Sequence, residues 1–467
     1  MNTNRREFLT GAALAAGGAA LTGCSSGRCC GGAAAACGPT GAPMLGFCAP
    51  KLERVRIGVV GVGERGWRAS ERLAGVPGVE VAAICDNVPE KIVRTRELLV
   101  KKGVKPPREF GGDEGWKALC DWDGVDVVYN TTPWYMHAKV GVYAMKAGKH
   151  VMIEVPAAMY LDECWELVET AEKTRRHCMQ LENCIYGEAE MLGLALCREK
   201  MFGDLLYGEC GYLHDRRVGV FSDIYTDHWR MWWNVRHRGD QYPTHGLGPI
   251  CRYMDVNCGD RLDFLVSVDT KQAGYEAYAK EKFPGTWKAD LKFQTGDATF
   301  TTIRTVNGRV IVIKHDTTSP RPYSRINRIQ GTKGVFEGSC GADSSWPLRA
   351  AFDRGEKTPW LNADELEKLR REHMHPLWKA AGELAVKVGG HGGMDFLMDL
   401  SWTHSMRRGL PLDMSVYDLA SWCSVCETSE RSVRSGSQPQ RLPDFTRGAW
   451  KTAKPREIAP VDVNDMV

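Results

Sequence analysis

A glycine-rich turn between an apolar run and an amphipathic segment most constrains how this chain can fold. The run VRIGVV leads into GVGERG, where Gly61, Gly63 and Gly66 complete the pattern GxGxxG. Such glycines allow a tight strand-to-helix turn, close approach of a diphosphate and close helix packing. Asp86 follows twenty positions after Gly66, at the end of a second apolar run. A carboxylate there accepts hydrogen bonds from ribose hydroxyls and repels a 2′-phosphate, so the pattern predicts NAD rather than NADP. The alternative for Asp86 is a helix cap or a solvated turn.

Strand-like and helix-like segments alternate after Arg54 in the order that a parallel sheet requires. After about Tyr186 the segments become β-rich, with few helices expected between them, and Asn307-Gly308 is a hairpin signal. We expect an α/β protein with an N-terminal Rossmann domain, a doubly wound parallel sheet, over residues 54–184. An α+β domain with an open-faced, mainly antiparallel sheet is expected over residues 185–467, and its C-terminal segment is a candidate to pack back on the first domain.

The first 53 residues have the composition of an export leader and a tether. Arg5 and Arg6 precede a short run of Ala, Gly and Leu that ends at Cys24. Twin arginines before a weakly apolar run are typical of a Tat signal, and Leu21-Thr22-Gly23-Cys24 is typical of a lipobox whose cysteine is lipidated. We therefore predict a signal over residues 1–23, a flexible tether over 24–53, and a periplasmic or membrane-anchored lipoprotein. The alternative is a disordered basic tail on a cytosolic protein.

Charge and cysteine content exclude some classes of partner. A formal net charge of +3 over 467 residues does not favour a nucleic-acid binder. Five of the 17 cysteines lie in the first 53 residues, and most of the others lie in apolar runs, as expected of core residues. Cys423 and Cys426 form a CxxC without a second pair, which is a weak zinc signal. We predict no metal, and the sequence leaves oligomerisation open.

Two further strand ends are expected to open into the nucleotide crevice. One is TTPWYMH, residues 131–137, and the other is Glu154-Val155-Pro156. Ligands in doubly wound sheets bind beyond the carboxyl ends of the strands, which places both segments near a dinucleotide. The alternatives are a structural role for His137 and core packing for Trp134.

At these positions the chain resembles the Gfo/Idh/MocA oxidoreductase family, from roughly Arg54 to the C-terminus. In ordinary members a lysine follows the glutamate equivalent to Glu154 and assists proton transfer at the substrate hydroxyl, whereas this chain has Val155. With this departure, the chain more closely resembles glycoside hydrolase family 109, whose members use NAD to act on α-linked N-acetylgalactosamine and typically carry Tat-like leaders. The stretches that carry this resemblance are EVP (154–156), LEN (181–183), YLHD (212–215), QYPTHGLGP (241–249) and SPRPY (319–323).

The resemblance implies two sets of contact residues. The cofactor set, which includes one glycine of the turn, is Gly63, Glu64, Arg65, Asp86, Trp134, Tyr135, Met136, His137, Glu154, Val155 and Asn183. The substrate set is Tyr212, Arg230, Tyr242, Pro243, Thr244, His245 and Tyr323.

The family mechanism needs a base of near-neutral pKa and a hydrogen-bond donor at the sugar. It oxidises sugar C3, eliminates the C1 substituent after loss of the C2 proton, adds water and reduces C3 again. Histidine and tyrosine suit this acid–base work, and we assign it to His245 and Tyr242 without dividing their duties. Tyr186 and Tyr323 are further candidate donors. The competing hypotheses are an NAD-dependent sugar dehydrogenase and a non-catalytic exported sugar-binding protein.

Overall fold

The computed structural model describes residues 41–338 and 348–461. The predicted signal, the lipobox at Cys24 and most of the predicted tether lie outside these residues. Within the described part of the chain, no helix is both long and apolar enough to cross a membrane.

The first sheet has six strands in the order β3-β2-β1-β4-β5-β6, and every neighbouring pair is parallel. Its strands are β1 (Val55–Val60), β2 (Val79–Asp86), β3 (Arg108–Gly111), β4 (Val127–Asn130), β5 (His150–Ile153) and β6 (Cys178–Gln180). The order reverses direction between β1 and β4, and this topological switch point is where such sheets form a ligand crevice. The predicted doubly wound sheet is therefore confirmed. The sequence did not predict β3, because this edge strand is mostly exposed and has no apolar run.

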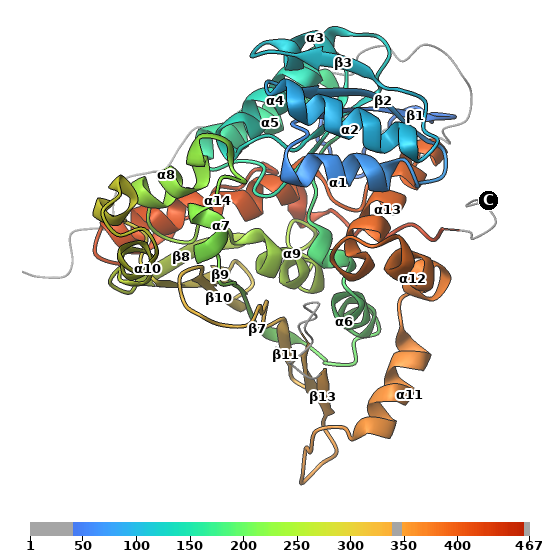
Figure 1. Cartoon of the computed structure of the whole chain (residues 1–467). Coiled ribbons are helices and arrows are strands. Elements are labelled where there is room, and N and C mark those ends of the chain that lie inside the picture. The colour runs from blue at the N-terminus through green and yellow to red at the C-terminus, as the bar shows by residue number, and fades with distance from the viewer. Residues whose placement is uncertain (1–40, 339–347, 462–467) are drawn as a thin grey trace, which may run out of the picture. The chain divides into compact units, whose positions relative to one another are not determined.

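Helices connect these strands and cover the sheet (Figure 1). They are α1 (Glu64–Leu73), α2 (Pro89–Lys101), α3 (Gly115–Asp121), α4 (Trp134–Lys146) and α5 (Leu161–Thr174). Buried valine, isoleucine and alanine side chains fill the strands, which is typical of a sheet covered on both faces.

The second sheet has eight strands in the order β13-β12-β11-β7-β10-β9-β8-β14. They are β7 (Leu205–Leu213), β8 (Leu262–Asp269), β9 (Ala298–Thr305), β10 (Val310–Asp316), β11 (Arg328–Gly331), β12 (Gly334–Glu337), β13 (Arg349–Phe352) and β14 (Gln440–Arg441). The pair β7–β10 is parallel and the other pairs are antiparallel, which confirms the mainly antiparallel prediction. The predicted hairpin joins β9 to β10, with Gly308 at a φ of +88°.

The expectation of few helices in this second region was wrong. It contains α6 (Glu188–Arg198), α7 (Arg217–Phe221), α8 (Trp229–Arg236), α9 (Thr244–Tyr253), α10 (Gly274–Lys282), α11 (Ala363–His373), α12 (Pro376–Val388), α13 (Met394–Arg408) and α14 (Val416–Arg434), and the 3-10 turns η1 (Asn183–Tyr186), η2 (Thr226–His228), η3 (Trp287–Asp290), η4 (His391–Gly393) and η5 (Ala449–Lys451). Tertiary packing overrides local propensity in α9, whose sequence THGLGPICRY contains glycines and an internal proline and is almost entirely buried.

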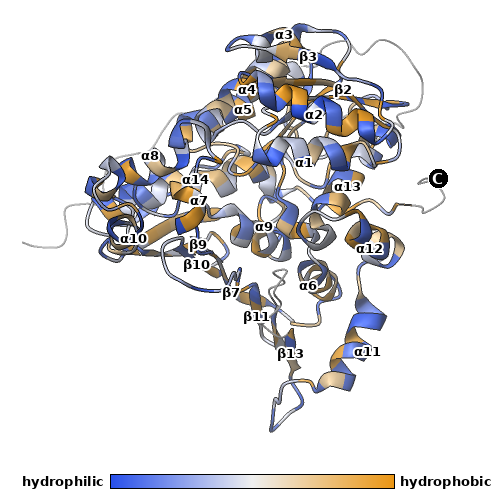
Figure 2. Ribbon diagram, viewed as in Figure 1, coloured by the Kyte–Doolittle hydropathy of each residue, from blue (hydrophilic) through white to orange (hydrophobic). Residues whose placement is uncertain are grey.

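The last two long helices pack against the first domain, and α14 also contacts the second sheet. Helix α13 contacts α1, and α14 contacts both α5 and β8 (Figure 1). All but two residues of α13 are buried, whereas α11, in which only Leu369 is buried, is largely hydrophilic (Figure 2). The C-terminal helices thus bring side chains to the domain that contains the parallel sheet.

Candidate active site

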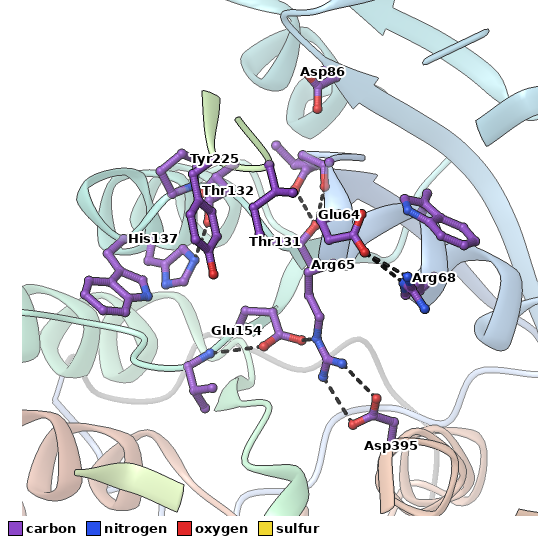
Figure 3. A pocket seen from close by; sticks show the side chains of 18 of the residues that line it. Glu64, Arg65, Arg68, Asp86, Thr131, Thr132, His137, Glu154, Tyr225 and Asp395 are labelled. Carbon is purple, nitrogen blue, oxygen red and sulfur yellow. Dashed lines mark hydrogen bonds and ion pairs between the residues drawn. The ribbon is translucent and has the colours of Figure 1, made fainter. Parts of the chain in front are cut away.

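A cavity of about 1490 Å³ lies between the carboxyl ends of the parallel strands and the second sheet. Residues of the glycine turn, both predicted strand ends, β7, α8, α9 and the start of α13 line it. Figure 3 shows part of this lining, with Asp86 lying well away from Glu154 and Asp395. The cavity therefore joins the predicted nucleotide site to the predicted substrate residues.

The glycine turn leaves room for a ligand and not for side chains. Gly61 has a φ of +89°, and a Cβ on Gly66 would lie 1.9 Å from the carbonyl oxygen of Gly61. A Cβ on Gly63 would meet no atom closer than Lys91 Nζ at 3.9 Å. The third glycine is therefore required for helix packing, and the second leaves open space before the N-terminus of α1. This cradle fits a diphosphate.

Asp86 serves the turn and the cavity together. Its Oδ1 accepts a hydrogen bond of 3.0 Å from the backbone N–H of Val88, and Lys91 Nζ lies 4.0 Å away. Asp86 thus stabilises the turn that leads into α2, and its remaining acceptor sites leave the ribose contact a prediction.

A buried ionic network holds the residues between the two ends of the cavity. Arg65 donates from Nε to Glu154 Oε1 at 2.5 Å and from Nη1 to Asp395 Oδ2 at 2.8 Å (Figure 3). Asn183 Nδ2 donates to Asp395 Oδ1 at 2.6 Å. Burial alone would raise the pKa of Asp395, but the guanidinium groups of Arg65 and Arg72 hold it well below its ordinary value. Asp395, which was not predicted from the sequence, thus joins Arg65 to Asn183, and Arg65 adds Glu154 to the network.

Asp395 could not be predicted from local patterns because it lies far along the chain from its partners Arg65 and Asn183. The available signal was the run GGHGG that precedes Met394 and Asp395, since all four of these glycines have positive φ values. Such a run marks a backbone conformation that other residues rarely adopt.

His137 has its imidazole fully engaged. Nδ1 lies 2.7 Å from the carbonyl oxygen of Pro156, and Nε2 lies 2.7 Å from that of Thr132. Burial lowers its pKa. The side chain ties the two predicted strand ends together, which is the structural alternative, although the residue also lines the cavity.

The position of the missing lysine is apolar. Val155 is 5% exposed and clusters with Trp134, Tyr212 and Tyr242. Trp134 is buried, and Arg230 Cζ lies 4.7 Å from the centroid of its ring. Tyr135 and Met136 line the cavity beside it. An apolar side chain thus occupies the position at which the resemblance to ordinary Gfo/Idh/MocA members would imply a lysine.

His245 and Glu182 form a close pair in the substrate half of the cavity. His245 Nδ1 lies 2.7 Å from Glu182 Oε1, and Glu182 is fully buried. Burial raises the pKa of this carboxyl, but the charge and hydrogen bond of His245 and the backbone N–H of Cys184 together lower it. Since Nδ1 is occupied, Nε2 is the nitrogen available to a ligand. Glu182 belongs to the LEN stretch (181–183), from which its pairing with His245 was not predicted.

Tyr242 lies beside this pair as a neutral phenol. Its ring meets that of His245 edge-on at 4.9 Å and that of Tyr212 at 4.5 Å. Burial raises the pKa of Tyr242 well above its ordinary value, so it is a hydrogen-bond donor at neutral pH. Pro243 and Thr244 are buried in the first turn of α9 and, among the described residues, are not part of the cavity wall.

The remaining predicted substrate residues surround the same space. Tyr212 Oη lies 2.9 Å from His214 Nδ1, and Tyr323 accepts a hydrogen bond from Arg325 at 3.3 Å. Both tyrosines and Arg230 line the cavity. Tyr186 is different: it is fully buried and donates to Asp413 at 2.9 Å, away from the cavity wall.

Potential metal ligands occur once near the site within the described residues. Atoms of Glu182, Cys184 and His245 lie within 4.8 Å of one another. Burial raises the pKa of the Cys184 thiol well above its ordinary value, which keeps it protonated and a poor ligand. Cys423 and Cys426 are buried in α14, where Cys423 Sγ lies 2.9 Å from Gln180 Oε1. The absence of a metal stays a prediction.

The fold and the cradle define an NAD-binding oxidoreductase class. Residues 55–181 match the oxidoreductase family with an NAD-binding Rossmann fold, the Gfo/Idh/MocA family. A solved structure of levoglucosan dehydrogenase in complex with NADH and L-sorbose has a TM-score of 0.63, with 18% identity, and covers 84% of this chain and 100% of its own. At that identity the likeness establishes the fold.

The second region narrows the class. Residues 186–452 match the C-terminal domain of glycosyl hydrolase 109. A glycosyl hydrolase family 109 protein from Bacteroides thetaiotaomicron is 45% identical over 417 residues, 87% of this chain and 88% of its own. An alpha-N-acetylgalactosaminidase from Shewanella oneidensis is 42% identical over 424 residues, 90% and 91% of the two chains. The chain belongs to glycoside hydrolase family 109, with NAD as its cofactor.

Proposed function

We propose that this enzyme hydrolyses terminal α-linked N-acetylgalactosamine through an NAD-dependent cycle of oxidation, elimination, water addition and reduction. The observation that carries the proposal is the His245–Glu182 pair, 2.7 Å apart, beside Tyr242 in the cavity that continues from the glycine turn. The name of the Shewanella oneidensis relative supports the sugar.

The chain's own residues suit the acid–base part of such a cycle. Bound NAD supplies reversible hydride exchange with a sugar carbon, which acidifies the neighbouring C–H bond. Glu182 fixes the tautomer of His245 with the proton on Nδ1, so that Nε2 is free to take a proton from the sugar. Tyr242 donates a hydrogen bond to a sugar oxygen, and the two share the acid–base work. Two carboxylates across the scissile bond are not needed in an NAD-dependent route.

A sugar dehydrogenase is the second candidate function, because the fold is that of an oxidoreductase. Val155 disfavours it, since a buried apolar side chain cannot assist proton transfer at a substrate hydroxyl.

Hydrolysis without added cofactor separates these functions. The purified holoenzyme is incubated with 4-nitrophenyl α-N-acetylgalactosaminide, and nitrophenol and NADH are recorded together. The proposal expects many turnovers of nitrophenol with no net NADH. Stoichiometric NADH without nitrophenol would favour the dehydrogenase, and binding without either product would favour a sugar-binding protein.

Export is the second part of the proposal, and it rests on the sequence of residues 1–24. A cofactor regenerated in each turnover needs no external supply, and a Tat-like route carries proteins that are already folded. The chain would therefore leave the cytoplasm with NAD in place and remain in the periplasm or on the membrane through Cys24. Fractionation of the producing cell, followed by nucleotide extraction, tests this. An empty yet fully active exported protein would contradict it.

A further inference from the structure

One of the tyrosines that line the cavity, Tyr225, differs from the others in its surroundings. Tyr225 lies on the segment between α7 and α8, and its hydroxyl points into the cavity (Figure 3). Arg216 Nη2 donates to that hydroxyl at 2.6 Å and Arg230 Nη1 donates to it at 3.1 Å. Neither guanidinium forms an ion pair with a carboxylate among the described residues.

The geometry assigns the direction of the phenolic proton. A tyrosine oxygen has two lone pairs and one hydrogen. The two arginines occupy both lone pairs, so the O–H bond of Tyr225 must point away from them. Within residues 41–338 and 348–461, no side chain accepts a hydrogen bond from this hydroxyl. The acceptor for this hydrogen is therefore a water molecule or a ligand in the cavity.

The electrostatics set Tyr225 apart from its neighbours. Burial raises the pKa values of Tyr212, Tyr242 and Tyr323. Burial also acts on Tyr225, but the positive charges and hydrogen bonds of Arg230 and Arg216 outweigh it and lower its pKa. His214, which bonds Tyr212, is neutral because burial and the same arginines lower its pKa to about 3.

We propose that Tyr225 is a further catalytic residue, the general acid that protonates the departing glycosidic oxygen. This inference rests on the proposed function. As the C1–O bond breaks, its electron pair stays on the leaving oxygen, and the Tyr225 proton passes to that oxygen. The products are the free alcohol and a tyrosinate held by two guanidinium groups. When water then adds at C1, the tyrosinate takes a proton from that water and the phenol is restored.

A leaving-group series tests this role. The holoenzyme and Tyr225→Phe are compared on 2,4-dinitrophenyl, 4-nitrophenyl and benzyl α-N-acetylgalactosaminides. A good leaving group needs no proton, so we expect a loss in kcat/KM below about threefold for dinitrophenyl and of at least about 100-fold for benzyl. Arg216→Gln keeps the phenol but removes one guanidinium, and a graded loss of about tenfold on the benzyl substrate is expected.

Controls separate catalysis from folding. Tyr143→Phe removes a phenol that bonds Asp121 on the surface of α4, and it should leave the whole series unchanged. Retained nucleotide and an unchanged thermal midpoint establish that each variant is folded.

A spectroscopic measurement gives an independent readout. In a titration at 295 nm, the difference between the wild type and Tyr225→Phe should contain one phenolate that appears below the ordinary pKa of about 10. Other charged or titratable groups near this segment are Lys91, which donates to the adjacent Thr226, Asp227, and the pair Asp223–His228.

The outcomes are distinct. A loss of equal size on all three substrates, or no loss on the benzyl substrate, overturns the role of Tyr225 while leaving the proposed function intact. A wild type that cleaves none of the three removes the proposed function and this inference with it.

Discussion

The two halves of the cavity are assembled in different ways. The cofactor half is built around the first sheet: the turn from Gly61 to Gly66, Asp86 at the end of the next strand, and the strand ends at residues 131–137 and 154–156. The catalytic half brings together Glu182 and side chains from β7, α8 and α9, spread from Glu182 to Tyr323. A dinucleotide is recognised largely through backbone and helix termini, which a local motif can provide, whereas acid–base chemistry needs convergent side chains.

The largest effect is expected where the catalytic half is broken at its central pair. His245→Asn should lower kcat by about 10³-fold, because it removes the proton acceptor while preserving a hydrogen-bond donor to Glu182. Bound nucleotide should be unchanged, since the cofactor half is not touched. Steady-state kinetics with nucleotide extraction check this, and a variant that loses NAD as well would show that the two halves are not separable.

Asp395 bonds Arg65 and Asn183 of the cofactor half from a distant helix, so its loss should reduce both stability and cofactor retention. Asp395→Asn leaves Arg65 and Arg72 without a buried negative charge between them, although Asp399 and Glu154 remain. Breaking a buried ion pair typically costs about 3–5 kcal/mol, and we expect a loss of stability at the lower end together with weaker NAD retention. Urea unfolding and nucleotide content measure the two effects. Glu383→Gln, on the exposed face of α12, is the matched control.

The glycine turn offers a pair of variants that sharpens the comparison within the cofactor half. Gly66→Ala places a Cβ 1.9 Å from a backbone oxygen, so the turn must shift, and a loss of about 1–3 kcal/mol of stability is expected. Gly63→Ala has no neighbour closer than 3.9 Å and should keep its stability but retain less nucleotide. Equal thermal midpoints for the two variants would contradict the assigned roles.

A smaller effect is expected from the pH dependence of the catalytic half. Asp240 is buried, its Oδ1 accepts the backbone N–H of Tyr242, and burial raises its pKa to about 7. The protonated form is favoured in the fold, so the free energy of unfolding should fall as pH rises from about 4, the unfolded value, to about 7.

Asp240→Asn should remove that dependence. It should stabilise the protein at pH 8 by about 1 kcal/mol, because the gain from removing a buried charge is partly offset by the unpaired donor of the new amide. Thermal midpoints at pH 5 and pH 8 check this. A midpoint for the variant that falls between these two pH values as steeply as that of the wild type would show that Asp240 is not the titrating group.

The same contrast explains what the sequence could predict. The parallel sheet, the Gly61 turn and the β9–β10 hairpin follow from local patterns, and the structure confirms them. β3 and the buried helix α9 were missed, because an exposed edge strand and a glycine-containing helix carry weak local signals.

Site residues follow the same logic. Tyr242 and His245 were identified from a contiguous motif, and the structure places both at the cavity. Glu182 as the partner of His245 and Asp395 against Arg65 depend on contacts across 63 and 330 positions of sequence. Such pairings are decided by packing of the whole domain, and local composition does not encode them.

Proton exchange at the sugar tests the central claim most directly. The holoenzyme hydrolyses 4-nitrophenyl α-N-acetylgalactosaminide in heavy water without added NAD, and the released sugar is analysed by mass spectrometry and NMR. The account predicts one deuterium at C2, because the C2 proton is removed and replaced in each turnover. Hydrolysis that leaves hydrogen at C2 would contradict it.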